Sequence, residues 1–380
     1  MSRAPRTDAS PEGPNPSTSS SAPPLDSAFT WHSESSEPAP ARLSPVNDRL
    51  SADTALKRVR RGEFLLYSGD FHNAKQLLGA LSRRLPRPAK ARSPLEAFRA
   101  ERRARQLEHE TLSRIVVSLD RDYRLGLARA PDTSLACHQV WGASTTDTTV
   151  VPLKQLLGML GAAEWRRKGL AVPGLTGLLH PHYGVYLPTR TDYVELLNSV
   201  TEVKGKRVFD IGTGTGVLSF ILLQRGAASV QATDCDSRAV ACSQENAERL
   251  GLGKRFQVAE ADLFPKGTAD LVVCNPPWIP EPPKNRVDRA VFDEDSQFLR
   301  RFLEGLSRFA CSPGEWACCS CRTSRCCSAC AHPGGSKRSS NGAACRCSGP
   351  GRPRRGIRKR RTRQTRCTWR ALASAPRSTA

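Results

Sequence analysis

The chain has 380 residues, which is enough for two domains with hydrophobic cores of their own. The net charge is +22, but the residues from 311 onward carry +15 of it, so the charge alone does not identify a nucleic-acid-binding protein. No apolar run has transmembrane length and the N-terminus has no apolar signal core, so we expect a soluble protein of the reducing cytoplasm.

The N-terminal part is expected to contain a disordered segment and an accessory domain. Residues 1–50 are rich in Ser, Pro and Ala and poor in large aliphatic side chains, and such a composition cannot offset the entropy of an ordered chain. Residues 51–164 are predicted to form an accessory α/β domain that recognises the substrate. Apolar spacing predicts a helix over Ala74–Leu81, a charged helix over Ala97–Glu110 and a strand over Ile115–Leu119.

Residues 165–310 are predicted to form a second domain, in which strands alternate with helices. The expected strands are Arg207–Ile211, Ser229–Thr233, Arg255–Ala259 and Leu271–Cys274. The expected helices are Val217–Leu223, Ser237–Leu250 (with Ser237 and Gly251 as its caps) and Phe298–Phe309. This alternation is typical of a parallel sheet with right-handed crossovers, and we predict a Rossmann-like doubly wound α/β fold.

The composition changes abruptly after Phe309. Residues 311–380 contain ten cysteines and no Val, Phe, Tyr or Met, so they cannot build a core. We expect a disordered Cys/Arg-rich tail and a C-terminally incomplete sheet, because the next apolar strand does not come. A reading-frame shift near codon 312 is our hypothesis for the change. The two C-x-x-C pairs of the tail lie too close together for the usual zinc loop, and we predict no metal site.

A glycine-rich loop follows the first strand of the second predicted domain. Its glycines allow a tight turn and let a ligand approach the backbone closely. The ligand is expected beyond the carboxyl end of the strand, at the N-terminus of the following helix. The candidate ligand-binding residues of this loop are Asp210, Gly212, Thr213, Gly214 and Gly216.

Acidic residues follow the next two predicted strands. Asp234 lies about twenty residues after the glycines, where a carboxylate can accept hydrogen bonds from a ribose diol, and Asp236 is the alternative. After the third strand, Asp262 can accept a hydrogen bond from an adenine amino group while Leu263 covers the ring. A helix-cap or turn aspartate explains Asp262 as well.

The sequence Asn275-Pro276-Pro277-Trp278 follows the fourth predicted strand. Its two prolines cannot donate hydrogen bonds to a sheet, so they end the strand and stiffen the loop. The Asn275 side chain and the Pro276 carbonyl can then point at one amino group, and Trp278 offers a flat face to a planar substrate. A plain strand-ending turn is the alternative, but the glycine-rich loop upstream favours a functional interpretation.

These motifs, in this order and on successive strands, resemble the class I S-adenosylmethionine-dependent methyltransferases over residues 183–309. Within that superfamily the chain is similar to the methyltransferase small domain group, which includes the release-factor glutamine N5-methyltransferases and the ribosomal-RNA guanine-N2 methyltransferases. Gly184–Arg190 resembles the segment that precedes the cofactor domain in this group, and Ile279–Glu281 is similar to the glutamine enzymes. Gly62–Phe71 resembles part of the accessory domain of the RNA enzymes.

The resemblance implies S-adenosylmethionine as cofactor, bound by the loop residues together with Asp234, Asp262 and Leu263. It implies catalytic roles for Asn275, Pro276, Pro277 and Trp278, acting on an NH2 attached to a planar group. The leading expectation is an N-methyltransferase for an exocyclic amino group of a nucleic-acid base in RNA. One alternative acceptor is a protein glutamine amide. Another alternative is a basic nucleic-acid-binding protein with an inactive methyltransferase domain.

Overall fold

The computed structural model describes residues 29–34, 38–88, 91–189, 192–197, 200, 202–283, 287–309, 315–318, 343–347 and 367–371. The chain divides into two compact units. The first comprises Met1–Trp31, Ala39–Pro131 and Thr145–Leu153, and the second comprises His32–Pro38, Asp132–Ser144 and Lys154–Ala380. The predicted boundary between residues 164 and 165 falls inside helix α5 (Leu153–Lys168).

The first unit is built on a five-stranded sheet with the order β1-β5-β4-β3-β2. Neighbouring strands are parallel, except that β4 and β5 are antiparallel. The strands are β1 (Thr30–Trp31), β2 (Leu43–Val46), β3 (Phe64–Tyr67), β4 (Ile115–Leu119) and β5 (Thr149–Pro152). The prediction of disorder for residues 1–50 is therefore wrong for β1 and β2. Each pairs with an apolar strand that is distant in sequence, which the local composition does not reveal.

The helices of the first unit are α1 (Ala52–Arg60), α2 (Phe71–Arg84) and α3 (Pro94–Leu112). The predicted helices over 74–81 and 97–110 are confirmed as parts of α2 and α3, and the predicted strand over 115–119 is confirmed as β4. α2 begins earlier than predicted because the Asp70 carboxylate caps it, accepting from the N–H groups of His72 (2.8 Å) and Asn73 (3.1 Å).

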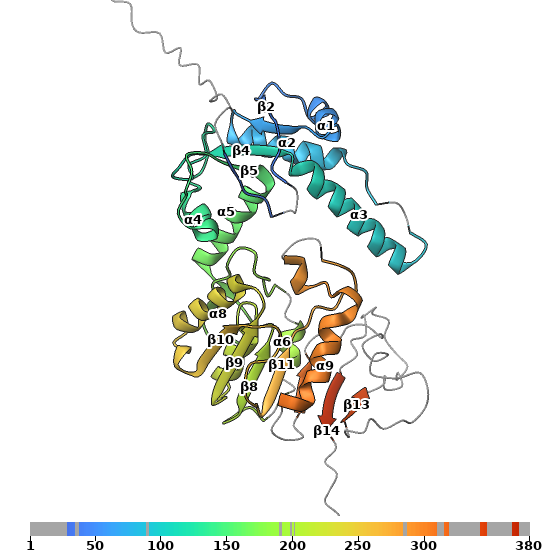
Figure 1. The fold of residues 1–380 in the computed structure, drawn as a ribbon, viewed down its shortest axis with the longest axis vertical. Coiled ribbons are helices and arrows are strands. Elements are labelled where there is room, and N and C mark those ends of the chain that lie inside the picture. The colour runs from blue at the N-terminus through green and yellow to red at the C-terminus, as the bar shows by residue number, and fades with distance from the viewer. Residues whose placement is uncertain are drawn as a thin grey trace, which may run out of the picture. The chain divides into compact units, whose positions relative to one another are not determined.

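The second unit contains a seven-stranded sheet with the order β10-β9-β8-β11-β12-β14-β13 (Figure 1). Its first four strands are β8 (Arg207–Ile211), β9 (Ser229–Asp234), β10 (Phe256–Glu260) and β11 (Leu271–Cys274). They are parallel and agree with the predicted strands to within a residue at each end. The chain runs outward from β8 through β9 to β10, and then returns to the other side of β8 at β11. This change of direction opens a crevice at the carboxyl ends of β8 and β11, where doubly wound folds bind ligands.

The sheet continues beyond β11, which differs from the incomplete sheet expected from the sequence. β12 (Glu315–Cys318) pairs parallel with β11, and β14 (Cys367–Ala371) pairs antiparallel with both β12 and β13 (Ala343–Cys347). Strand pairing uses backbone groups that every non-proline residue carries, so a poorly apolar segment can still extend a sheet. The other residues of the tail lie outside the described part of the chain, as do the predictions made for them.

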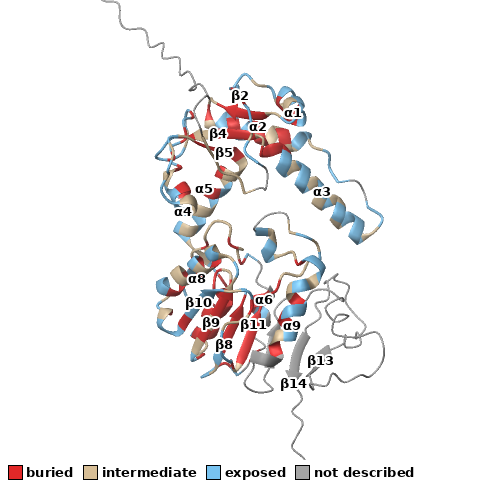
Figure 2. Cartoon of the chain, viewed as in Figure 1, coloured by how far each residue is buried: buried red, intermediate tan, exposed pale blue. Residues whose placement is uncertain are grey.

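Helices α7 (Val217–Gln224), α8 (Ser237–Arg249) and α9 (Gln297–Phe309) confirm the three helices predicted for this unit. α7 is buried all round and packs into the core that contains Val208 and Val230, whereas α9 packs with Phe209 and Val272. Strands β8, β9 and β11 are largely buried (Figure 2), with α7 packed in one core cluster and α9 in the other. The helix cap of α8 differs from the prediction: Asp236, not Ser237, is the N-cap, because its carboxylate accepts from the Arg238 N–H (3.0 Å). The C-cap is Leu250.

The smaller elements of the second unit connect these layers. They are α4 (Ser134–Trp141), the antiparallel pair β6 (Leu170–Ala171) and β7 (Leu178–Leu179), α6 (Asp192–Leu197), and the 3-10 helices η1 (Gly253–Arg255), η2 (Val287–Ala290) and η3 (Glu294–Ser296). Among the helices that the structure describes, none is both long enough and apolar enough to cross a membrane.

Candidate active site

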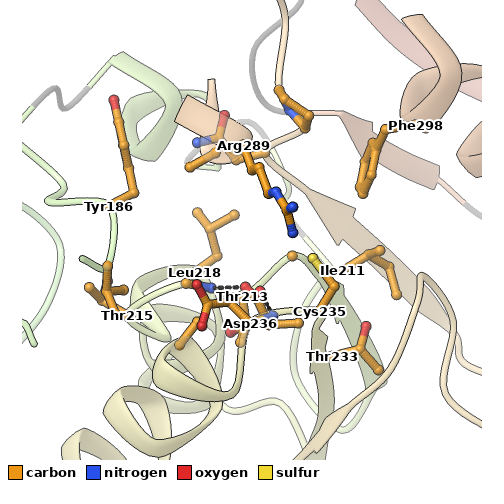
Figure 3. Close-up of a pocket in the computed structure, with 18 of the residues that line it drawn as sticks. Tyr186, Ile211, Thr213, Thr215, Leu218, Thr233, Cys235, Asp236, Arg289 and Phe298 are labelled. Carbon is orange, nitrogen blue, oxygen red and sulfur yellow. Dashed lines mark hydrogen bonds between the residues drawn. The ribbon is translucent and has the colours of Figure 1, made fainter. Parts of the chain in front are cut away.

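A cavity of about 180 Å³ opens at the carboxyl ends of β8, β9 and β11 (Figure 3). Eight of the predicted site residues line it: Gly212, Thr213, Gly214, Asp234, Asp262, Leu263, Asn275 and Pro277. Four predicted residues are not part of the lining: Asp210, Gly216, Pro276 and Trp278. The fold thus brings the motifs of four successive strands to one place.

The glycine-rich loop is tied by its backbone to the end of β9. The N–H groups of Gly212 and Thr213 both donate to the Thr233 carbonyl, at 2.9 and 3.0 Å. Gly212 and Gly214 have φ values of +71° and +56°, in the left-handed region that favours glycine. A methyl group added at either would meet no atom within 4 Å. The loop therefore presents bare backbone and open space to a ligand in the cavity.

Gly216 lies outside the cavity lining, and its role is to let the start of α7 pack closely against a neighbouring side chain. It is the N-cap of α7 and has a φ of +86°. A methyl group at this position would lie 2.3 Å from the Phe220 ring. The last glycine of the motif is thus required because the helix starts against a buried aromatic ring.

Asp210 lies beneath the loop and is 1% exposed. One carboxylate oxygen accepts from the hydroxyl groups of Thr213 (2.9 Å) and Ser219 (2.6 Å), and the other has no hydrogen-bond partner among the described residues. Burial raises the pKa of Asp210 to about 6. In this position Asp210 holds the loop through Thr213 rather than facing the cavity.

Asp234 and Asp236, the two candidates for ribose binding, both line the cavity. Asp234 accepts from the N–H of Gly214 (2.9 Å) through one oxygen and from the N–H of Asp236 (3.0 Å) through the other. Burial raises the pKa of Asp234. Asp236 instead caps α8. Of the two, Asp234 is therefore the carboxylate that joins the glycine-rich loop.

Asp262 and Leu263 lie on the turn after β10. The Asp262 side chain is exposed and forms an ion pair with Arg301 of α9, an arrangement compatible with the alternative of a turn aspartate. Leu263 is buried and has a φ of +73°, and its carbonyl accepts from the Thr233 hydroxyl. A bulky residue in the left-handed region is unusual, and such strain occurs most often at ligand sites.

The Asn-Pro-Pro-Trp turn forms another wall. Asn275 and Pro277 face the cavity, and Pro276 is buried. The N–H groups of Trp278 and Ile279 both donate to the Val291 carbonyl at 3.0 Å, which fixes the turn against the residue after η2. Trp278 is half-buried and is absent from the cavity lining. Its expected stacking on an acceptor stays a prediction.

Sequence reasoning missed several lining residues. Tyr186 comes from the segment 184–190 that the resemblance had singled out, but Tyr193, Arg289 and Phe298 carry no motif signal. The Arg289 side chain reaches into the cavity from η2 (Figure 3). Its place is set by the loop after the proline turn, and a short 3-10 helix has no periodicity that could reveal it.

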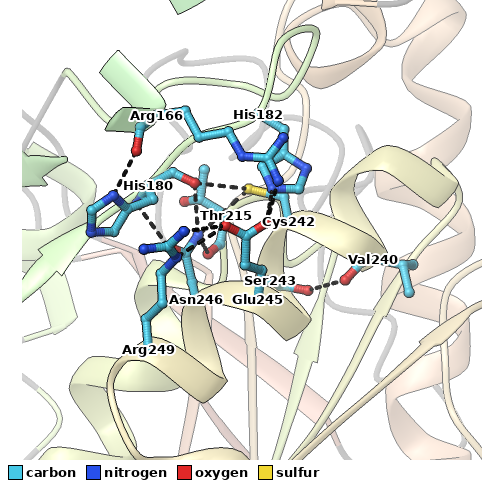
Figure 4. A network of polar contacts seen from close by, with 10 residues as sticks. All are labelled: Arg166, His180, His182, Thr215, Val240, Cys242, Ser243, Glu245, Asn246 and Arg249. Atoms are coloured by element: carbon cyan, nitrogen blue, oxygen red, sulfur yellow. Dashed lines mark hydrogen bonds and ion pairs between the residues drawn. The ribbon is translucent and has the colours of Figure 1, made fainter. Parts of the chain in front are cut away.

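The histidines of the His180-Pro181-His182 sequence join a polar network. The His182 Nε2 lies 2.8 Å from the Glu245 carboxylate, and the His180 Nδ1 lies 2.7 Å from the Arg166 carbonyl (Figure 4). Within the described ranges no cluster of three or more His, Cys, Asp or Glu side chains could hold a metal ion. Six of the ten cysteines of the tail lie outside those ranges.

Known proteins resemble part of this chain. A family model described as ribosomal protein L11 methyltransferase (PrmA) matches residues 188–276. A putative protein N5-glutamine methyltransferase of Methanocaldococcus jannaschii is 31% identical over 148 residues, which cover 37% of this chain and 73% of that protein. A tRNA1(Val) (adenine(37)-N6)-methyltransferase of Tolumonas auensis is 41% identical over 88 residues, which cover 22% of this chain and 37% of that protein.

Other similarities cover smaller parts or are weaker. A ribosomal protein L11 methyltransferase of an Exiguobacterium species is 47% identical over 74 residues, which cover 19% of this chain and 24% of that protein. The solved structure of a ribosomal protein L11 methylase from Lactobacillus delbrueckii subsp. bulgaricus is 24% identical, with a TM-score of 0.27, and the match covers 38% of this chain and 63% of that one. Except for the Methanocaldococcus protein, the chain spans less than two thirds of the length of each of these proteins.

Proposed function

Because the chain belongs to the class I S-adenosylmethionine-dependent methyltransferases and is an N-methyltransferase, we propose that its acceptor is the exocyclic NH2 of a nucleic-acid base in RNA. The observation that carries the proposal is the meeting of the Asn275–Pro277 turn and the Gly214–Asp234 pair in one cavity. A donor held by the loop and an amine held by the turn would then lie side by side.

The residues of the cavity fit the cofactor. Gly212 and Gly214 leave open space along the loop, and Asp234 provides a carboxylate fixed by two backbone N–H groups. When bound, S-adenosylmethionine supplies a methyl group that is already electrophilic. The protein chiefly has to orient the acceptor for in-line displacement.

The proline turn has the acceptor groups that an NH2 needs. The lone pair of such a nitrogen is delocalised into its planar group. The Asn275 side-chain oxygen would accept one N–H, which favours a more tetrahedral nitrogen and accommodates the developing charge. The Pro276 carbonyl as acceptor of the second N–H stays a prediction, because Pro276 is buried and absent from the cavity lining. This chemistry needs no strong general base.

The distribution of charge supports a polyanionic acceptor. Residues 39–131 of the first unit contain 20 Lys and Arg but only 10 Asp and Glu, whereas residues 154–310 contain 20 and 18. Outside the tail, the positive excess is thus concentrated in the unit that does not contain the cavity. A basic surface attracts phosphates regardless of base sequence. A base in a helix would also have to be unstacked to enter the cavity.

A protein glutamine amide is the second candidate acceptor. It presents the same planar NH2, and the match to the relative named as a putative N5-glutamine methyltransferase covers 73% of that protein. The Ile279-Pro280-Glu281 sequence after the turn supports the same acceptor.

The test is methyl transfer from radiolabelled S-adenosylmethionine to three acceptors: transfer RNA, ribosomal RNA and a release factor. We expect label in RNA. Label in the release factor alone would replace the proposal with the second candidate. Absence of transfer to every acceptor, together with salt-sensitive RNA binding, would indicate the alternative of a nucleic-acid-binding protein with an inactive domain.

A further inference from the structure

One buried side chain of α8 links the segment before one wall of the cavity to another wall. Gly184–Tyr186 contribute to one wall, and Thr215 of the glycine-rich loop contributes to the other. Asn246 is 0% exposed and is hydrogen-bonded both to His180, four residues before Gly184, and to Thr215. Its Oδ1 accepts from the His180 N–H (2.7 Å), and its Nδ2 donates to the Thr215 carbonyl (3.3 Å), as Figure 4 shows. These partners fix the orientation of the amide, because an N–H needs the oxygen and a carbonyl needs the nitrogen.

The neighbouring residue, Glu245, holds the same segment by an ionic contact. Its carboxylate accepts from the His182 Nε2 (2.8 Å), from Arg249 (2.8 Å) and from Arg166. Burial alone would raise the pKa of Glu245, but these three hydrogen bonds outweigh it and lower the pKa to about 2. Glu245 is therefore ionised near neutral pH. Because a carboxylate can only accept, the proton of His182 lies on Nε2.

The segment also packs directly on α8. Val185 is buried together with Ala239 and Cys242. A methyl group added at Gly184 would lie 2.4 Å from the guanidinium of Arg238. The segment that follows His182 is therefore in van der Waals contact with the helix that carries Glu245 and Asn246, so a shift of these side chains moves the cavity wall.

We propose that Asn246 and the His182–Glu245 pair are positioning residues for the cofactor. None of the three lines the cavity. They act by keeping the distance between the Gly184–Tyr186 wall and Thr215 of the glycine-rich loop constant. The inference rests on the cavity being the cofactor site and is independent of the identity of the acceptor.

The experiment compares Asn246→Ala with Ser243→Ala in the full-length chain, using calorimetric Kd values for S-adenosylmethionine and melting temperatures. Ser243 is a matched control: it is 0% exposed on the same helix, and its hydroxyl donates to the Val240 carbonyl (3.0 Å) within the helix. Loss of a buried hydrogen-bonded amide should raise the Kd about tenfold or more. Ser243→Ala should change the Kd by less than about twofold, even where its melting temperature falls.

A second pair of variants keeps the inference testable if Asn246→Ala does not fold. The His182 side chain is 15% exposed. His182→Ala should weaken cofactor binding, whereas His182→Gln retains an N–H donor for Glu245 and should restore most of the affinity. The KM for the acceptor should stay the same in both.

Wild-type affinity in folded Asn246→Ala, an equal loss in Ser243→Ala, or wild-type affinity in His182→Ala would overturn the proposal. The cofactor Kd of Asp234→Ala, measured in the same series, distinguishes failure of the cavity assignment from failure of the positioning role. If this variant also binds normally, the cavity is not the cofactor site. If it binds poorly, only the positioning role is refuted.

Discussion

The backbone N–H of Gly214 donates to the Oδ2 of Asp234 across 2.9 Å, which joins the glycine-rich loop of β8 to the end of β9. The two residues are 20 positions apart in the chain, and both line the cavity. The bond makes the loop and the carboxylate one rigid surface for a ligand.

Replacing Asp234 with Ala should raise the Kd for S-adenosylmethionine by about tenfold to a hundredfold, because it removes a carboxylate acceptor and frees the Gly214 N–H. Isothermal calorimetry measures the effect. Asp270→Ala is the matched control, since Asp270 pairs with Arg207 at the opposite ends of the strands. Equal Kd values for the two variants would contradict the role of Asp234.

Replacing Asn275 with Ala should abolish methyl transfer while leaving the cofactor Kd within about twofold of the wild type. The physical reason is that Asn275 is expected to bind the acceptor nitrogen rather than the donor. Single-turnover transfer and calorimetry separate these quantities. A parallel loss of both transfer and cofactor affinity would argue against this assignment.

Substitutions at two glycines of the loop should have different effects, one on stability and the other on cofactor binding. Gly216→Ala places a methyl group 2.3 Å from the Phe220 ring, so we expect a loss of unfolding free energy of about 1–3 kcal/mol or more. Gly214→Ala meets open space, so beyond the cost of its φ of +56° it should chiefly weaken cofactor binding. Urea unfolding and calorimetry measure the two effects. The reverse ranking, with Gly214→Ala the less stable protein, would refute this division.

Asp210 should make stability depend on pH. Burial raises the pKa of Asp210 from 3.8 to about 6, and the nearby Asp234 carboxylate adds to the rise. The hydrogen bonds from the Ser219 and Thr213 hydroxyl groups lower the pKa but do not outweigh burial. The folded state thus binds the proton more tightly than the unfolded state. The resulting stability, about 3 kcal/mol at most, is present below pH 3.8 and is lost as the pH rises through about 6.

Asp210→Asn removes this titration. As the pH rises from 4 to 7, the wild type should therefore lose unfolding free energy relative to the variant. Urea unfolding of both proteins at several pH values measures this difference. A difference that stays constant over this range would mean that Asp210 titrates normally in the folded protein.

Local sequence was sufficient to predict those strands and loops whose own residues constrain the backbone or form a short apolar run. The short, largely apolar segments at 207–211 and 271–274 are strands β8 and β11. Each is followed closely by glycine or proline turn residues, which limit it to the length of a strand. The glycines after β8 and the prolines after β11 indicated the loops of the cavity because both residue types constrain the backbone directly. The aromatic and basic side chains on the remaining walls, among them Tyr193 and Arg289, had no such signal.

The sequence by itself determined the family, the order of strands and helices in the second unit, and the loop and turn residues that meet at the cavity, because glycine, proline and hydrophobic periodicity act over a few neighbouring residues. Only the tertiary structure decided that Asp236 caps α8 while Asp234 holds the loop, and that Trp278 lies outside the cavity lining. It also decided that Asn246 is hydrogen-bonded to both His180 and Thr215. These features depend on which groups become neighbours after packing, and a side chain's hydrogen-bond partner can lie tens of residues away. The pairing of β12 with β11 has the same origin, since backbone groups of any composition can extend an open sheet edge.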